Sequence, residues 1–288
     1  MDRFEQLAIP TGDGDAVHMR LFRPSGAAKG APRAGVLIVP AMGVTQTFYA
    51  AFAEWLAGQG FLVATFDYRG VGLSRRGGLR RLDVDILDWA RLDCDAVTTA
   101  LAERLGAAPL YWIGHSLGGQ ILPFVPGHER IAKMVTIASG SGYWRENALP
   151  LRRFAWWLWY VVAPVATALC GYFPGRRLRK VGDLPAGVMW QWRRWCLDPD
   201  YAAGAEGPGA RRAYAALALP IVSLSFSDDE FMSARNTEAL HACYAGAARR
   251  MKRLSPAEVG MKRIGHFGFF RRDCQDPLWR DHLLPELA

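Results

Sequence analysis

The sequence has few of the features that mark metal-binding, disulfide-bonded or secreted proteins. Its five cysteines stand at positions 94, 170, 196, 243 and 274, and no two of them form a C-x-x-C pair. These spacings match neither a zinc site nor a disulfide framework. The first 15 residues contain no basic segment followed by an apolar one, so we expect no secretory signal. The sequence therefore predicts reduced thiols, a cytoplasmic location, no metal and no cofactor.

The chain also lacks the motifs of nucleic-acid-binding proteins, although its net charge is +8. Residues 141–212 carry 11 Arg or Lys against 5 Asp or Glu, so one segment holds most of the excess. This segment contains no helix-turn-helix, zinc-finger or RNA-binding motif. We expect no nucleic-acid partner.

Short apolar runs alternate with amphipathic stretches, which is the pattern of a mostly parallel α/β sheet. Residues 35–39 (GVLIV), for example, are largely β-branched and bounded by Gly and Pro, so they predict a buried strand. Further strands are expected over residues 17–22, 61–66, 110–113, 131–138, 221–226 and 249–254. Helices are expected over residues 46–57, 88–105, 117–125, 234–245 and 277–284.

Residues 141–215 break this alternation. They contain seven of the eleven tryptophans as well as the basic excess. A segment inserted between two strands of an open α/β sheet lies over the carboxyl ends of the strands, where such sheets bind ligands. We expect residues 1–140 and 216–288 to form the core and residues 141–215 to form a mainly helical cap.

Within this cap, residues 154–170 (FAWWLWYVVAPVATALC) carry no charge and lie between Arg152–Arg153 and the basic segment 176–180. A transmembrane helix needs about 20 residues, and Pro164 interrupts this run. A span here would also put the two parts of the core on opposite sides of a bilayer. We expect a buried cap helix. Peripheral contact with a membrane is the alternative, because tryptophans flanked by arginines suit the headgroup region.

Residues 111–122 read YWIGHSLGGQIL and contain a G-x-S-x-G motif centred on Ser116. A strand that runs directly into this motif and then into a helix forms a tight turn, which lifts the serine hydroxyl above the sheet edge. Gly114 and Gly118 are needed where neighbouring backbones pass too close for a Cβ. The free N–H groups of a helix starting here would favour negative charge near the serine. The motif predicts that Ser116 is a nucleophile.

A serine nucleophile needs a base, and the base needs an acid that orients it. In this architecture the chain order is Ser, Asp, His. His266 stands in the glycine-flanked loop IGHFG and is the expected base, because the other histidines precede the serine or fall near or within helices. The expected acid is Asp229, at the end of the strand IVSLSF. Asp228 is the alternative acid; if Asp229 has that role, Asp228 would hold the loop by accepting backbone hydrogen bonds.

The tetrahedral intermediate of acyl transfer needs two backbone donors. One is expected to be the N–H of Leu117, which follows the nucleophile. The other is expected from the loop Pro40-Ala41-Met42-Gly43 after the 35–39 strand, with the N–H of Met42 as the donor.

These motifs resemble those of the α/β-hydrolase superfamily of serine hydrolases, over nearly the whole chain. Residues 67–74 (DYRGVGLS) are similar to the superfamily's D-x-R-G-x-G-x-S loop. Residues 183–196, 225–231 and 264–270 resemble a set of bacterial predicted α/β hydrolases with a Trp-rich cap. The chain departs from many members in having Pro40-Ala41 where they carry His-Gly.

The resemblance and the motifs together predict a serine hydrolase that cleaves a carboxylic ester or thioester through an acyl-enzyme intermediate. The Trp-rich cap suggests a small-molecule substrate with an apolar acyl group. The alternatives are an acyltransferase that uses the same three residues and a non-catalytic binding protein on the hydrolase fold. Nothing in the sequence indicates an oligomeric state.

Overall fold

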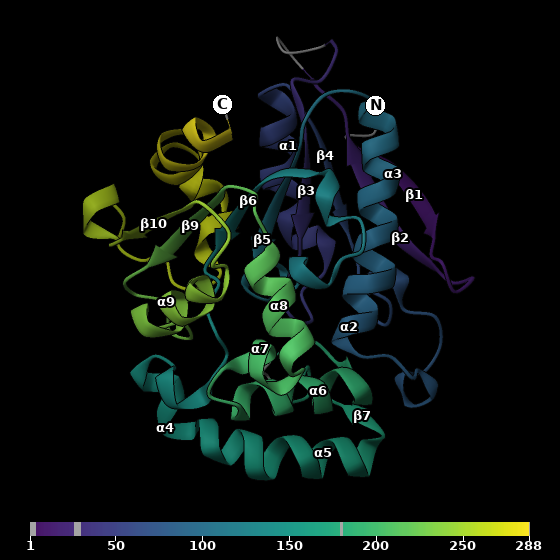
Figure 1. The fold of residues 1–288 in the computed structure, drawn as a ribbon, viewed down its shortest axis with the longest axis vertical. Helices are drawn as coiled ribbons and strands as arrows, with labels where there is room; N and C mark the ends of the chain where they lie inside the picture. Colours follow the sequence, from purple (N-terminus) through teal and green to yellow (C-terminus); the bar gives the residue numbers. More distant parts are fainter. Residues whose placement is uncertain (1–3, 26–29, 179–180, 288) are drawn as a thin grey trace.

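The computed structural model describes residues 4–25, 30–178 and 181–287, so the last two residues of the basic segment 176–180 lie outside the described part. An eight-stranded sheet with the strand order β1-β2-β4-β3-β5-β6-β9-β10 runs through the molecule (Figure 1). The neighbouring strands from β4 to β10 are parallel, and β1 and β2 are antiparallel additions at one edge. The expected α/β class with a mostly parallel sheet is confirmed.

Most of the predicted strands are apolar runs that the sheet buries; β10 (Arg249–Leu254) is the exception, a basic and mostly exposed strand that pairs with β9. β3, β4 and β9 are buried at every position, as expected of strands covered on both faces. The strands are β1 (Glu5–Pro10), β2 (Ala16–Phe22), β3 (Ala34–Val39), β4 (Phe61–Phe66), β5 (Leu110–His115), β6 (Ile131–Ile137), β9 (Ile221–Phe226) and β10 (Arg249–Leu254). β1 was not predicted, because only Ile9 of this edge strand is buried and it shows no clear alternation.

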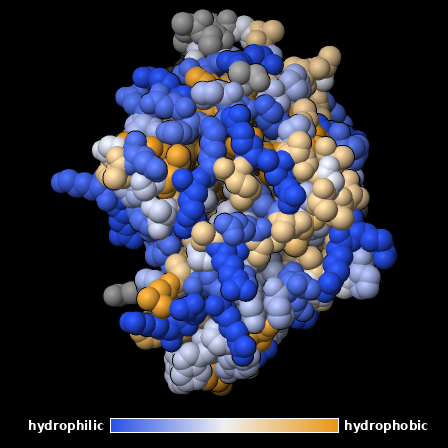
Figure 2. All heavy atoms as spheres, turned by 60° about the vertical axis from the view of Figure 1, so that its left-hand side comes forward, coloured by the Kyte–Doolittle hydropathy of each residue, from blue (hydrophilic) through white to orange (hydrophobic). Residues whose placement is uncertain are grey.

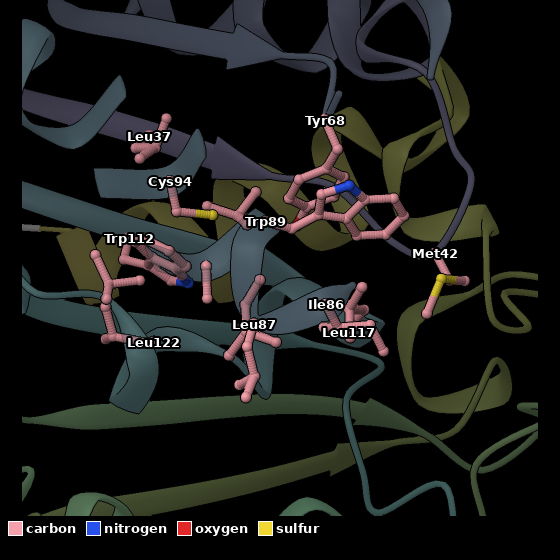
Figure 3. Close-up of a cluster of buried hydrophobic side chains, with 14 of the residues drawn as sticks. Leu37, Met42, Tyr68, Ile86, Leu87, Trp89, Cys94, Trp112, Leu117 and Leu122 are labelled. Carbon is pink, nitrogen blue, oxygen red and sulfur yellow. The ribbon is translucent and has the colours of Figure 1, made fainter. Parts of the chain in front are cut away.

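Each face of the sheet carries its own hydrophobic core. On one face, α1 (Ala50–Gly58) and the π-helical segment Gln275–Leu283 pack through side chains such as Phe52 and Trp279. On the other face lies α3 (Asp95–Leu105), which follows α2 (Ile86–Asp88) and the π-helical segment Trp89–Cys94. Figure 3 shows part of this second core, where the rings of Tyr68 and Trp89 stack at 4.5 Å. α9 (Ala234–Cys243) contributes Leu240 to the same core.

The predicted helix over residues 117–125 is wrong. The chain forms a 3₁₀ turn at Ser116–Gly119 and a second one at Leu122–Phe124. Gly118 and Gly119 are poor helix formers, and Pro123 has no N–H to continue an α-helix. The N-terminus of an α-helix expected beside Ser116 is therefore absent. The backbone N–H groups next to the serine belong to a 3₁₀ turn instead.

The D-x-R-G-x-G-x-S segment is a structural loop. The Asp67 carboxylate accepts hydrogen bonds from the backbone and side-chain N–H groups of Gln46 and from the N–H of Leu73. A Cβ at Gly72 would lie 2.4 Å from the Asp67 Oδ2 atom, so only glycine fits there. Arg69 donates to Asp93 from both its backbone N–H and its Nε. The motif fixes the chain between β4 and α2.

Of the helices between β6 and β9, α4 to α7 lie beyond one end of the sheet, below the strands in Figure 1, and α8 leads back from them towards the sheet. The helical elements are α4 (Leu149–Trp157), the π-helical segment Leu158–Val162, α5 (Ala163–Cys170), α6 (Ala186–Leu197), α7 (Tyr201–Ala205) and α8 (Pro208–Ala216). Two short strands, β7 (Tyr172–Phe173) and β8 (Leu184–Pro185), pair between α5 and α6. Buried residues of the helical elements, among them Trp159 and Trp195, continue the core around α3.

The expected burial of the apolar cap helix is only partly correct. α4, the π-helical segment and α5 form one helix, Leu149–Cys170, of which 22% of the most apolar window is buried. By length and composition alone it could cross a membrane, and one such helix is weak evidence of a span. One side of the helix packs on the protein and the other carries exposed apolar side chains, because the helix lies on the outside of the cap.

Candidate active site

Ser116 sits in a strained backbone conformation directly after β5. Its φ angle is 51°, a value that costs energy for any residue with a Cβ. The two flanking glycines make this turn sterically feasible. A Cβ at Gly114 would lie 2.3 Å from the Gly118 carbonyl carbon, and one at Gly118 would lie 2.2 Å from the Val39 carbonyl oxygen. The turn therefore packs closely against the end of β3 and holds Ser116 at the carboxyl end of the sheet.

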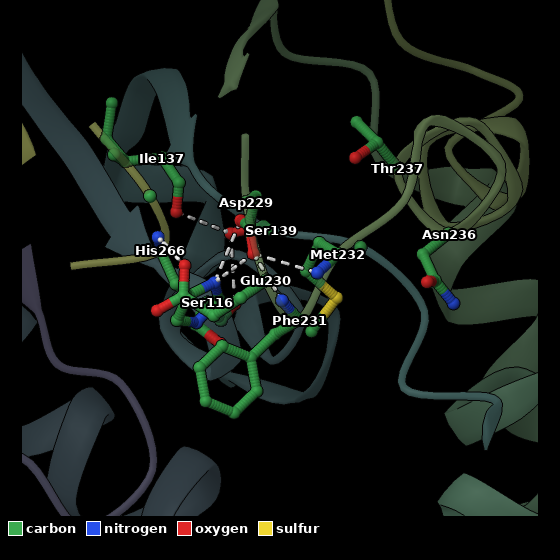
Figure 4. A network of polar contacts seen from close by, with 12 residues as sticks. Ser116, Ile137, Ser139, Asp229, Glu230, Phe231, Met232, Asn236, Thr237 and His266 are labelled. Carbon is green, nitrogen blue, oxygen red and sulfur yellow. Dashed lines mark hydrogen bonds and ion pairs between the residues drawn. The ribbon is translucent and has the colours of Figure 1, made fainter. Parts of the chain in front are cut away.

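Asp229 and His266 meet at the same end of the sheet. The loop after β9 carries Asp229, and the segment after β10 carries His266. The His266 Nδ1 atom lies 2.9 and 3.1 Å from the two Asp229 carboxylate oxygens, and both side chains are buried (Figure 4). Asp229 Oδ1 also accepts the N–H groups of Phe231 and Met232 at 2.8 Å each. These bonds fix the carboxylate, so that it can hold a proton on Nδ1 and leave Nε2 as the basic nitrogen.

Asp228 faces away from the imidazole. Its carboxylate accepts the backbone N–H groups of Ile264 and Gly265 at 2.9 and 3.1 Å. Glu230 completes the arrangement by accepting the N–H of His266 at 3.1 Å. Three consecutive acids thus fix the segment that carries His266, each through different groups. Glu230 is not among the site residues expected from the sequence, and its position next to Asp228-Asp229 is the only local signal for this role.

A buried hydrogen-bonded chain links the loop after β3 to His266. The Ala41 N–H donates to the Tyr49 hydroxyl oxygen at 2.9 Å, and this hydroxyl lies 2.8 Å from His115 Nδ1. His115 Nε2 lies 3.0 Å from the His266 carbonyl oxygen, which can only accept. His115 is therefore protonated on Nε2 and accepts from Tyr49 on Nδ1. Burial, and secondarily the charge of His266, lowers the pKa of His115 well below its usual value, so the ring stays neutral.

Tyr49 and His115 are not among the site residues expected from the sequence. Both are fully buried, and burial raises the pKa of the Tyr49 hydroxyl, which keeps its proton for His115. Because His115 precedes Ser116 and bonds to His266, it brings the expected nucleophile and the expected base together. No hydrogen bond joins the side chains of Ser116 and His266 within the described residues, and such bonds often tighten only when substrate binds.

A small cavity of about 50 Å³ lies beside Ser116 and is shared by Met42 and Leu117. Neither backbone N–H of these two residues is hydrogen-bonded to a described group in a turn or loop. The remaining wall is mainly apolar and comes largely from the cap and the loop after β9: Gln120, Gly142, Asn147, Leu151, Trp159, Trp192, Cys196, Tyr201, Phe231 and Met232. The site thus combines a strained serine, a carboxylate-held imidazole and two backbone donors.

The described part of the chain contains no group of three or more His, Cys, Asp or Glu side chains that could hold a metal ion.

The fold and the serine turn define an α/β-hydrolase, and more narrowly a serine hydrolase of this superfamily. The model of the family described as serine aminopeptidase, S33 (Hydrolase_4) matches residues 30–179, which is just over half of the chain, and the protein belongs to this family. The matched region includes Met42, Ser116 and Leu117 and ends before Asp229 and His266. No curated protein matches the chain.

Solved structures with the same fold are distant in sequence. An esterase from Pyrococcus furiosus is 12% identical, with a TM-score of 0.62 over 99% of this chain and 89% of that one. A soluble variant of monoglyceride lipase from Saccharomyces cerevisiae, bound to a substrate analogue, is 15% identical, with a TM-score of 0.62 over 86% and 87% of the two chains. An α/β serine hydrolase without a lid from Xanthomonas campestris is 12% identical, with a TM-score of 0.56 over 100% and 96%. At these identities the similarity establishes the fold.

Proposed function

We propose that this protein is a serine esterase that cleaves a carboxylic ester or thioester with an apolar acyl group. The observation that carries the proposal is the strained Ser116 at the end of the sheet where Asp229 holds the imidazole of His266. Met42 and Leu117 lie with Ser116 in the wall of the adjoining cavity. Ser116, Asp229 and His266 are the proposed catalytic residues. The backbone N–H groups of Leu117 and Met42 are the proposed oxyanion donors.

In the first half of the proposed reaction, Ser116 Oγ attacks the acyl carbonyl carbon and gives its proton to His266 Nε2. Asp229 holds the Nδ1 proton and stabilises the imidazolium ion that forms. The carbonyl oxygen becomes an oxyanion, which accepts hydrogen bonds from Leu117 and Met42. Each such donor is worth about 3–4 kcal/mol to the transition state.

In the second half, the tetrahedral intermediate collapses and the bond to the alcohol or thiol breaks. The leaving group takes the proton from His266 and departs, and the acyl group remains on Ser116. A water molecule then attacks the acyl carbon and gives its proton to His266. Collapse of this second intermediate releases the carboxylic acid and restores Ser116 with its proton.

The cavity wall supports an apolar acyl group. Leu151, Trp159, Trp192, Phe231 and Met232 contribute apolar surface next to Ser116. No Asp or Glu lines this cavity, whereas a peptide with a free amino terminus carries a positive charge that needs a carboxylate when it is buried. This difference favours esters over the aminopeptide substrates that the family description suggests. Two of the proteins with a similar fold, an esterase and a monoglyceride lipase, agree with this choice.

We propose further that residues 141–215 act as a cap over this site, on a core of residues 1–140 and 216–288. A cavity of about 50 Å³ is far smaller than the roughly 300–1,000 Å³ of typical ligand pockets. A medium-length acyl chain therefore requires the cap to shift when the substrate enters. All five cysteines are free, which supports the proposed cytoplasmic location.

A substrate panel tests the proposal. The purified protein and its Ser116→Ala variant would be assayed with p-nitrophenyl esters of increasing chain length, acyl thioesters and aminoacyl p-nitroanilides. We expect turnover of esters or thioesters by the unmodified protein, none by Ser116→Ala, and no turnover of the anilides. Hydrolysis of the anilides alone would overturn the proposed substrate class.

A further inference from the structure

The helix Leu149–Cys170 presents large apolar side chains to solvent on one side. Phe154 is 68% exposed and Leu169 is 78% exposed, which is unusual for side chains of this size. We call this set the apolar face; its members are Leu149, Phe154, Trp156, Trp157, Tyr160, Val165 and Leu169. Figure 2 shows pale and orange spheres among blue ones at the lower end of the molecule, where the cap lies.

The opposite side of the same helix is fixed to the cap. Ala155, Trp159, Ala163 and Thr167 are buried at every fourth position, which is the spacing of one helix face. The Trp159 and Trp192 rings meet edge to face at 5.0 Å, and the Trp159 carbonyl oxygen accepts from Arg193 Nε at 2.6 Å. Because this side packs on the cap through Trp192 and Arg193 of α6, the helix lies along the surface of the protein.

The charged residues within and next to this helix in the sequence, from 147 to 182, have one sign. The sequence contains no Asp or Glu between Glu146 and Asp183. Arg152 and Arg153 lie at one end of the helix, and Arg176 and Arg177 follow its other end; all four are exposed, and no described carboxylate pairs with their side chains. The exposed Arg80 donates to the Cys170 carbonyl oxygen at 2.6 Å and so adds a further cation at the second end.

From these observations we propose that the apolar face binds the surface of an anionic lipid bilayer. In this arrangement the helix lies parallel to the membrane, with its aromatic and aliphatic side chains at the level of the headgroups and upper acyl chains. Tryptophan and tyrosine favour this region, and arginines at both ends of the helix would contact lipid phosphates.

The distribution of charge favours a lipid surface over a second copy of the chain. If two apolar faces met, the arginine pairs of both copies would lie at one uniformly basic interface, with no carboxylate from residues 147–182 to compensate them. An anionic bilayer supplies the missing negative charge along the whole helix. The position of the cavity agrees with this partner, because Leu151 and Trp159 of the same helix line the space beside Ser116.

Co-sedimentation with vesicles tests the proposal without depending on catalysis. The Ser116→Ala protein would be mixed with phosphatidylcholine vesicles that contain either no anionic lipid or about one-third phosphatidylglycerol. We expect the bound fraction to rise steeply with phosphatidylglycerol. A double substitution, Phe154→Ser with Leu169→Ser, should weaken binding at least tenfold, because it removes the two most exposed apolar side chains.

A matched control changes an exposed apolar and an exposed basic residue on β10, through Met251→Ser with Arg253→Glu. This control should bind the vesicles like the parent protein. Absence of binding to anionic vesicles would overturn the proposal, and so would binding that survives the Phe154/Leu169 substitutions. Light scattering measures the oligomeric state of the same proteins. If the parent protein were a dimer and the Phe154/Leu169 variant a monomer, the apolar face would be an interface between two copies of the chain, and the proposal would be wrong.

Discussion

Asp228 and Asp229 are neighbours in the chain, and the structure gives them different partners. The Asp229 carboxylate contacts His266 Nδ1, and the Asp228 carboxylate accepts two backbone N–H groups of the following loop. We expect Asp229→Asn to lower kcat by roughly 10³- to 10⁴-fold, because an amide cannot stabilise the imidazolium and favours the wrong tautomer. Steady-state kinetics on the best ester of the panel measures this loss.

Asp228→Asn is the matched control for this prediction. The asparagine keeps one oxygen that can accept one of the two backbone hydrogen bonds, so we expect a loss of less than about tenfold. If Asp228→Asn were the more damaging of the two substitutions, the assignment of Asp229 as the acid would be wrong.

Tyr49 and His115 act on the site from within the core, as positioning residues. In Tyr49→Phe, the Ala41 N–H loses its acceptor and His115 Nδ1 loses its donor. We expect the free energy of unfolding to fall by about 1–3 kcal/mol. We also expect kcat to fall by roughly 10- to 100-fold with little change in KM, since the loop of Met42 and the backbone of His266 both shift. Loss of stability with an unchanged kcat would show a structural role only.

Among the structural elements, the turn at Ser116 has the tightest steric requirement. A Cβ at Gly118 would meet the carbonyl oxygen of Val39, a backbone atom of β3 that cannot rotate away. We expect Gly118→Ala to cost at least about 3 kcal/mol of stability and to abolish activity. Thermal unfolding followed by circular dichroism measures the change.

Gly58→Ala is the corresponding control, because a Cβ at the end of α1 would meet no atom within 4 Å. Alanine is the better helix former, so this variant should be unchanged or more stable by up to about 1 kcal/mol. If the two substitutions had equal effects, the close approach of the Ser116 turn to Val39 of β3 would not be what requires glycine at position 118.

At the same scale, apolar runs were sufficient to predict the central parallel strands β3, β4, β5, β6 and β9, because strands covered on both faces need such runs. The helix after Ser116 could not be predicted in its true form. Its apolar residues suggested helical periodicity, but Gly118, Gly119 and Pro123 restrict the backbone more strongly. The edge strand β1 escaped prediction for the opposite reason, since an exposed edge places little demand on side-chain type.

Across the whole molecule, the candidate site depends on contacts between distant segments. The order Ser116, Asp229, His266 followed from motifs, and the choice of Asp229 over Asp228 was a prediction from the loop position. The chain from Ala41 through Tyr49 and His115 to His266 has no local pattern, and its last step alone joins residues 151 positions apart. Likewise, the apolar face became visible only once the packing of Leu149–Cys170 separated its buried side from its exposed side.

Buried neutral histidines should make the whole protein sensitive to acid. Burial lowers the pKa of His241 to about 4 from the ordinary value of 6.5, and that of His115 is also lowered. Between pH 4 and pH 6.5, His241 is protonated in the unfolded chain and neutral in the folded protein. Stability therefore falls as pH decreases from 6.5 towards 4, by about 2 kcal/mol per such histidine between pH 7 and pH 5.

Urea unfolding at pH 7 and pH 5 measures this effect. In His241→Gln the difference between the two pH values should shrink by about 2 kcal/mol, because glutamine does not titrate. The same pH dependence in the variant and the parent protein would contradict the contribution assigned to His241.

The most direct test of the proposed enzyme is reaction with a small fluorophosphonate, followed by intact-protein mass spectrometry. Only a serine activated by a neighbouring base reacts readily with this reagent, because an ordinary serine hydroxyl is a poor nucleophile. The account predicts one adduct per chain, lost in both Ser116→Ala and His266→Ala. An adduct that persists in Ser116→Ala, or ester hydrolysis by a protein that takes up no label, would contradict it.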